Sequence, residues 1–120
     1  MKFAHVTINV KDLEESIKFY QEVVGLPLVN RFPAGPNMEI VFLGEGETLV
    51  ELIHDAANPD ITIGKDISIG FAVDSLNDMM DFVKDKGIEI ESGPFEPNPN
   101  TRFFFVLDPN GLRVQFIEQK

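Results

Sequence analysis

The chain of 120 residues contains no cysteine and no tryptophan, and it has one tyrosine and two histidines. Without cysteine the protein has no disulfide, no thiolate nucleophile and no cysteine-ligated zinc or iron–sulfur site. No apolar run approaches the roughly 20 residues that are needed to span a bilayer. The first ten residues alternate like a strand and lack the apolar segment of a signal peptide. We therefore expect a cytoplasmic protein.

Basic residues are also few, with 10 Lys and Arg against 20 Asp and Glu and a formal net charge of -10. Because an acidic surface repels phosphates, nucleic acid and anionic membranes are excluded as expected partners. The acidity permits a cationic ligand or a divalent metal, although solubility alone also accounts for it. The aromatic residues are mostly phenylalanine, with 11 in the chain, and such rings fill a core or line an apolar cavity.

Hydrophobic patterning predicts one helix and four strands in the first half of the chain. Alternation over residues 2–10 indicates a strand, and Asp12 and Gly25 bound an amphipathic helix over 12–24. Three extended segments follow, at 26–32, 38–43 and 48–54. Residues 56–65 then lose periodicity and are interpreted as a linker.

The second half predicts the same elements in the same order. A strand at 66–74 precedes a helix that begins after Ser75 and ends at Gly87. The remaining segments are a short strand at 88–91, a proline-rich loop at 93–100, and strands at 101–107 and 112–118.

Matching positions around the first strand and the helix of each half are separated by the same offset. Val10 corresponds to Val73, and Leu13 to Leu76, each 63 residues later. One βαβββ unit is therefore expected twice, as modules 1–55 and 66–120 of a single α+β domain over residues 1–120. Because a single unit leaves one face of its sheet bare, the two modules are expected to form a concave sheet together.

The repeat also relates the polar positions on the bare faces. His5 corresponds to Ser68 at an offset of 63, and Glu51 corresponds to Gln115 at an offset of 64. Glu51 lies within the apolar strand TLVELIH, where an uncompensated carboxylate costs about 1–3 kcal/mol or more. Either a metal ion or a protonated His5 would compensate its charge. A metal site and a simple His5–Glu51 ion pair therefore both remain open.

Four segments resemble the vicinal oxygen chelate superfamily, which includes glyoxalase I (lactoylglutathione lyase), fosfomycin-resistance enzymes, extradiol dioxygenases and bleomycin-resistance proteins. They are MKFAHVTINVKDLEESIKFYQEVVGL, LVELIHD, ISIGFAVDSLNDMMDFVKDKGIEI and FFFVLDPNGLRVQFIE. The chain is most similar to small bacterial glyoxalase I-like proteins. This resemblance implies paired βαβββ modules, a homodimer, and a small-molecule ligand in the concavity.

The resemblance further implies metal ligands of the types His, Glu, His and Glu at the four related positions. His5 and Glu51 match, whereas Ser68 replaces a histidine and Gln115 replaces a glutamate. The implied site is therefore His5, Glu51 and Gln115, which would bind a divalent ion such as Zn²⁺ or Ni²⁺ weakly. The amide of Gln115 cannot act as a base, and Glu51 is the only carboxylate left at the four positions. Glu51 is therefore expected to be the catalytic residue.

These residues suggest a metal-assisted lyase or isomerase that acts on a small oxygenated substrate, and argue against true lactoylglutathione lyase activity. The alternative is a metal-free drug-binding protein of the bleomycin-resistance type, which the acidic charge would suit. Expected substrate contacts come from side chains that share the faces of the implied ligands. They are Ser68, Asn9, Arg113, Phe103 and Phe105.

Overall fold

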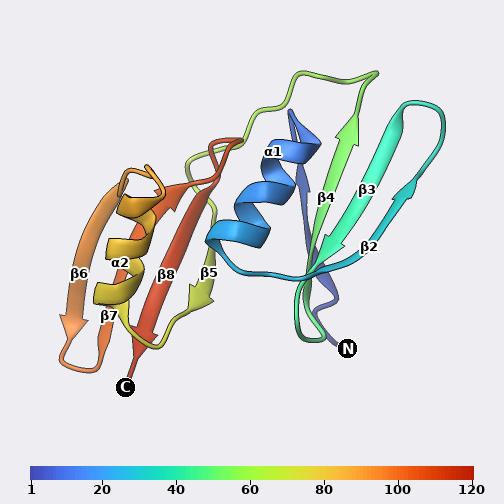
Figure 1. The fold of residues 1–120 in the computed structure, drawn as a ribbon. Coiled ribbons are helices and arrows are strands. Elements are labelled where there is room, and N and C mark those ends of the chain that lie inside the picture. Colours follow the sequence, from blue (N-terminus) through green and yellow to red (C-terminus); the bar gives the residue numbers. More distant parts are fainter. The chain divides into compact units, whose positions relative to one another are not determined.

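Each half of the chain folds as one four-stranded sheet with a helical segment against one face (Figure 1). The computed structural model describes residues 1–120 and divides them into two units, unit 1 at Met1–Thr62 and unit 2 at Ile63–Lys120. Both units have the element order βαβββ, which confirms the predicted fold class. The division between the units falls within the expected linker at 56–65. No helix in the chain combines the length and apolar character needed to cross a bilayer.

Unit 1 is a mixed sheet whose first and last strands are parallel neighbours. The strand order is β1-β4-β3-β2, with β1 parallel to β4 and the other pairs antiparallel. The elements are β1 (His5–Asn9), α1 (Leu13–Lys18), the π-helical η1 (Phe19–Val23), β2 (Leu28–Pro33), β3 (Met38–Leu43) and β4 (Leu49–Asp55).

Unit 2 repeats this topology, with the strand order β5-β8-β7-β6 and β5 parallel to β8. Its elements are β5 (Ser68–Ala72), α2 (Leu76–Asp85), β6 (Ser92–Asn98), β7 (Thr101–Leu107) and β8 (Arg113–Gln119). The internal repeat in the sequence is thus a repeat of sheet topology.

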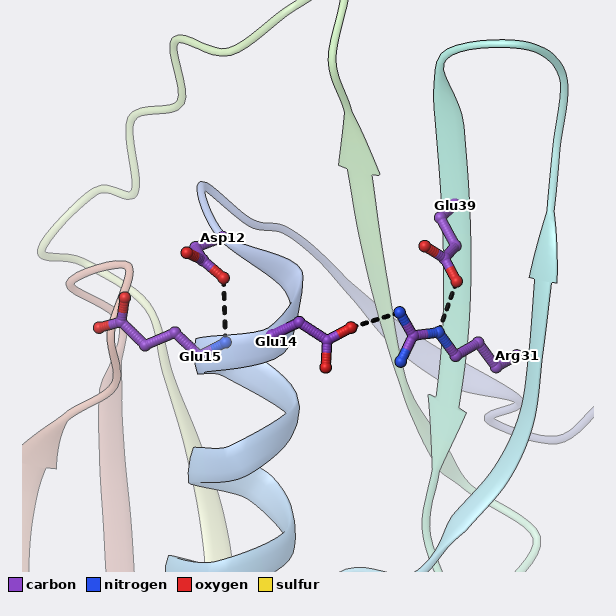
Figure 2. Close-up of polar contacts among 5 residues, drawn as sticks. All are labelled: Asp12, Glu14, Glu15, Arg31 and Glu39. Atoms are coloured by element: carbon purple, nitrogen blue, oxygen red, sulfur yellow. Dashed lines mark hydrogen bonds and ion pairs between the residues drawn. The ribbon is translucent and has the colours of Figure 1, made fainter.

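The two helices begin in the same way but continue differently. The Asp12 side chain accepts a hydrogen bond from the backbone N–H of Glu15, as an N-cap does (Figure 2), and Ser75 caps α2 through the N–H of Asp78. The first helix widens into a π-helix over Phe19–Val23, where sequence patterning predicts a regular α-helix. Its cap-to-glycine interval is one residue longer than that of α2, and a π-turn accommodates one extra residue.

Side chains alternate along the strands between a buried face that meets the helix and a second face. In unit 1, Val41, Leu43 and Leu52 are fully buried with the helical residue Tyr20. In unit 2 the equivalent core contains Phe104, Val106, Val114 and Phe116 together with Leu76 and Val83. We call the second face of each sheet, which carries the intervening residues, its helix-distal face.

The predicted short strand at 88–91 and loop at 93–100 are wrong, because the structure places β6 at Ser92–Asn98 instead. Proline lacks the N–H that a central strand needs, so Pro94 and Pro97 argue for a loop by sequence alone. β6 tolerates them because it is an edge strand that pairs only with β7 and shifts register twice along its length. Edge strands and irregular registers are where proline is accepted.

A charged triad joins the first helix to the edge of the sheet in unit 1 (Figure 2). Arg31 on β2 donates from Nε to Glu39 on β3 at 2.5 Å, and its second terminal nitrogen contacts Glu14 on α1. The hydrogen bond from Arg31 lowers the pKa of Glu39, and the two carboxylates raise the pKa of Arg31. The triad is exposed, so its contribution to stability is modest and depends on salt.

The lowered pKa of Glu39 predicts a specific pH dependence of stability. Because the folded-state pKa lies below the ordinary value of 4.5, the stabilisation is fully present above that pH. It is lost as pH falls through the folded-state pKa. Glu39→Gln should therefore lower the urea midpoint at about pH 7, and the difference from wild type should shrink towards about pH 3.

The matched control is Glu22→Gln, which removes an exposed carboxylate of the same unit that has no ion-pair partner. Its urea midpoint should track that of the wild type at every pH. Equal behaviour of the Glu39 and Glu22 variants would show that the triad does not couple to folding.

Candidate functional site

The helix-distal face of unit 1 brings polar side chains from its two parallel strands together. The register of β1 against β4 pairs Thr7 with Glu51, and β3 places Phe42 on the other side of Glu51. His5 lies two residues before Thr7 and therefore projects from the same face. The sequence prediction that His5 and Glu51 share a sheet face agrees with this register.

Glu51 is held through one of its carboxylate oxygens. The Thr7 hydroxyl donates to Oε1 at 2.5 Å, and Nε2 of His5 lies 3.5 Å from the same oxygen. The Glu51 side chain is only 12% exposed, whereas that of His5 is 42% exposed. Since the ion-pair partner is a histidine rather than a lysine or arginine, the carboxylate charge is balanced only when the imidazole is protonated or a cation binds.

The spacing of these two groups fits adjacent ligands of a divalent metal ion. Zinc ligands lie at about 2.0–2.2 Å, so two ligands at tetrahedral or octahedral angles are about 2.8–3.6 Å apart. The 3.5 Å between His5 Nε2 and Glu51 Oε1 lies within this range. Thr7 is placed to orient the carboxylate, as groups outside the ligand shell commonly do. No group of three or more His, Asp or Glu side chains in the chain could hold a metal ion by itself.

Aromatic rings fix the position of the imidazole. The His5 ring meets the Phe42 ring edge-on, with centroids 5.7 Å apart and an interplanar angle of 79°. Phe42 in turn stacks on Phe32 at 6.2 Å and 22°. The histidine therefore stands beside an apolar surface that could contact a ligand.

The corresponding position in unit 2 is occupied by Gln115 on β8, between Gly70 and Phe105. A Cβ atom added at Gly70 would lie 2.9 Å from Oε1 of Gln115, so the glycine gives the amide the room it occupies. The Gln115 side chain makes no hydrogen bond or ion pair, which leaves its carbonyl oxygen available as a ligand. Thr7, the oxygen-bonding neighbour of Glu51, corresponds to Gly70 here.

Arg113 lies two residues before Gln115 on the same face. It donates from Nε to Glu91 Oε2 and from one terminal nitrogen to Ser92 Oγ, both at 3.3 Å. Its guanidinium carbon lies 3.9 Å from the centroid of the Phe105 ring. Arg113 therefore forms an ion pair with a glutamate and also lies on the face that is predicted to contact substrate.

The other predicted substrate residues divide between the two sheets. Ser68 is an exposed cross-strand neighbour of Arg113, and Phe103 and Phe105 lie on the same helix-distal face of unit 2. Asn9 is exposed beside Ile53 in unit 1 and makes no hydrogen bond through its side chain. The structure therefore groups four residues with Gln115 in unit 2 and places Asn9 at the edge of the His5 cluster.

The contacts that hold Glu51 through Thr7, and Arg113 through two residues, could not be identified from the sequence. Thr7 bonds to Glu51, and Glu91 and Ser92 hold Arg113. The signal for Thr7 was its place on the face of His5, but only the strand register shows that it is the neighbour of Glu51. Glu91 ends the strand predicted at 88–91, and Ser92 falls between that strand and the loop predicted at 93–100, so sequence patterning does not bring them to Arg113.

Comparison with known proteins assigns the family. Residues 2–116 match the model of the Glyoxalase/Bleomycin resistance protein/Dioxygenase superfamily. The chain belongs to this superfamily. The resemblance noted in the sequence is thereby confirmed.

Individual relatives cover the whole chain. It is 32% identical to a lactoylglutathione lyase of Neisseria meningitidis, over 100% of this chain and 92% of that protein. It is 28% identical to a probable lactoylglutathione lyase of Synechocystis, over 98% and 95%. Among solved structures, a glyoxalase I mutant from Zea mays has a TM-score of 0.87 at 26% identity, over 98% of this chain and 44% of that chain. An antibiotic binding protein from Streptomyces shares the fold at a TM-score of 0.81 and 19% identity, over 100% and 97%.

The contact between Thr7 and Glu51 predicts a measurable loss of stability. Thr7→Val keeps the side-chain shape but removes the donor, leaving a nearly buried carboxylate oxygen with one partner fewer. In chelator-treated protein, the free energy of unfolding should fall by about 1–3 kcal/mol in urea titrations. Thr7→Ser retains the hydroxyl and should restore most of that loss. A valine variant as stable as the wild type would contradict the contact.

Proposed function

We propose that this protein is a metal-assisted lyase or isomerase that acts on a small oxygenated substrate, with His5, Glu51 and Gln115 as the protein ligands of one divalent ion. The observation that carries this proposal is the 3.5 Å separation of the His5 nitrogen and the Glu51 oxygen on one sheet face. The unpaired amide of Gln115 supports it, since it stands at the related position of the repeat.

The named relatives favour this class of chemistry. Proteins called lactoylglutathione lyase or probable lactoylglutathione lyase match nearly the full chain at 32% and 28% identity. This chain nevertheless carries Ser68 and Gln115 at two of the four ligand positions that the resemblance implies. We therefore propose that the reaction type is retained while activity on the glutathione substrate is low or absent.

When bound, a divalent ion polarises a carbonyl oxygen and stabilises the negative charge that forms on it. Glu51 would remove the proton from the carbon next to that carbonyl, because its second oxygen, Oε2, is not engaged by Thr7 or His5. Thr7 holds the carboxylate in one orientation, and Phe42 holds the imidazole. Gln115 cannot accept a proton at neutral pH, so Glu51 has to serve as ligand and base.

A metal-free small-molecule binding role is the second candidate. It is favoured by the His5–Glu51 pair, which can balance its own charge when His5 is protonated, and by the absence of any cluster of three ionisable ligands. The net charge of -10 suits a cationic drug as its ligand. If the wild-type protein binds neither Zn²⁺ nor Ni²⁺, this second candidate is favoured.

Titration with Zn²⁺ and Ni²⁺ tests the proposed site. The wild type should bind weakly, because catalytic zinc normally rests on three firm protein ligands. The double change Ser68→His with Gln115→Glu supplies an imidazole and a charged oxygen, and should raise the affinity at least tenfold, about 1.4 kcal/mol. Glu51→Ala removes the only charged ligand and should abolish binding.

The second histidine supplies the matched control for this titration. His54 lies on β4, where its Nδ1 is 3.3 Å from the backbone oxygen of Val10, away from the Glu51 oxygen. His54→Asn should bind metal like the wild type, whereas His5→Asn should not. Equal binding by all variants would place any metal elsewhere and leave the His5–Glu51 contact as an ion pair.

We further propose that the protein is a homodimer. Large apolar side chains are exposed in both units, including Phe3, Val29, Ile67 and Leu107. Burying such surface between two copies is favourable, and symmetric dimers are the commonest assembly. Light scattering at micromolar concentration should give twice the 13.5 kDa mass of one chain. A mass of one chain would contradict the dimer.

A further inference from the structure

The Arg113 guanidinium on the helix-distal face of unit 2 is only partly used. Its Nε donates to Glu91 and one terminal nitrogen donates to Ser92. These two hydrogen bonds use the side-on edge of the guanidinium, which is formed by Nε and that terminal nitrogen. The remaining terminal nitrogen makes no hydrogen bond or ion pair in the chain. The end-on edge, formed by the two terminal nitrogens, therefore keeps N–H groups that can bind a carboxylate in two parallel hydrogen bonds.

Glu91 and Ser92 fix the direction of this open edge. The Ser92 hydroxyl donates to Glu91 Oε2 at 2.7 Å, and that oxygen lies 3.3 Å from Arg113 Nε. The hydrogen bond from Ser92, and then that from Arg113, lower the pKa of Glu91, so this carboxylate remains ionised at neutral pH. The Phe105 ring supports the guanidinium from one side at 3.9 Å. Glu91 and Ser92 are thus positioning residues for Arg113.

An aromatic surface adjoins the guanidinium on the same face. Phe95, Phe103 and Phe105 form a cluster in which ring centroids are 5.5–6.5 Å apart. Phe95 is 44% exposed and Phe103 is half-buried, so both rings can still contact a ligand. The Arg113 side chain is 31% exposed, so a ligand can also reach the guanidinium. An open cationic fork beside exposed rings is complementary to an anion with a planar apolar body.

We propose that this face binds the carboxylate of an aryl or arylalkyl carboxylic acid, with Arg113 as the carboxylate-binding residue and Phe95 and Phe103 as the contacts for the ring. This site is built wholly from residues of unit 2 and goes beyond the proposed metal chemistry, which it does not require. In a chain with a net charge of -10, an anion has to be drawn to a local cation rather than to the general surface.

The test uses three probes with chelator-treated full-length protein: phenylacetate, its neutral analogue phenylacetamide, and acetate. Binding is followed at low salt by chemical-shift changes, including the side-chain Nε–H signal of Arg113. Phenylacetate should bind at millimolar concentration or below, and both other probes should bind at least tenfold more weakly. Arg113→Gln should weaken phenylacetate at least tenfold, whereas Arg113→Lys keeps the charge without the fork and should be intermediate.

The matched control is Arg102→Gln. Arg102 lies on β7 next to Phe103 in sequence but on the opposite face, where it donates to Asn77 at 3.2 Å. This change removes the same charge from the same strand pair and should leave phenylacetate binding unchanged. The backbone spectrum of each variant reports whether unit 2 remains folded, and Arg113→Lys retains the test should the glutamine variant unfold.

Three results would overturn the proposal: no binding of phenylacetate, equal binding of phenylacetate and phenylacetamide, or equal losses in the Arg113 and Arg102 variants. Glu51→Gln should leave probe binding intact, and Arg113→Gln should leave metal affinity intact. Wild-type protein that binds phenylacetate but neither Zn²⁺ nor Ni²⁺ would overturn the metal proposal alone. Wild-type protein that binds the metal but not phenylacetate would overturn the carboxylate site alone.

Discussion

The parallel pairing of the first and last strands of each unit is the constraint on which the candidate site depends. In unit 1 this pairing sets Thr7 beside Glu51, and with it His5 on the same face. A shift of one residue in the register of β4 would turn the Glu51 side chain into the apolar core that faces the helix, where it would lose its contacts with Thr7 and His5. The buried partners Val50 and Leu52 fix the register, because they fill the core under the helix. Packing on one face thus places the ionisable groups on the other.

The two units have kept the same framework while their helix-distal faces differ in charge. Unit 1 carries the imidazole and carboxylate of His5 and Glu51, whereas unit 2 carries neutral Ser68 and Gln115 at the related positions. Leu49, the neighbour of His5 in the register, corresponds to Arg113, the neighbour of Ser68. Unit 1 therefore presents groups suited to a cation, and unit 2 presents a group suited to an anion.

Much of the fold could be predicted from the sequence because its strongest signals are local. Alternating strands and the caps Asp12 and Ser75 follow from neighbouring residues. The same pattern recurs about 63 residues later, and the two together predict two βαβββ units. The π-helical turn and the proline-containing β6 could not be predicted in this way. The first reflects a one-residue insertion absorbed within a helix, and the second depends on the edge position of its strand.

The candidate site was predictable only in part for a related reason. Sequence alternation places His5 and Glu51 on bare faces, but the bond between Thr7 and Glu51 depends on the register of strands 44 residues apart. The contacts of Arg113 with Glu91 and Ser92 depend similarly on the path of β6, which lies where a loop was expected. The residue types therefore predicted which side chains could bind a ligand or transfer a proton. The pairing of the strands decides which of these side chains come into contact.

X-ray absorption spectroscopy of the nickel- or zinc-loaded protein tests the central claim, that His5 and Glu51 are ligands of one metal ion. The account predicts a shell of oxygen and nitrogen at about 2.0–2.2 Å that contains one imidazole, with water completing the coordination. The imidazole contribution should disappear in His5→Asn and remain in His54→Asn. A shell made only of oxygen in the wild type, or an imidazole contribution that survives in His5→Asn, would contradict the account.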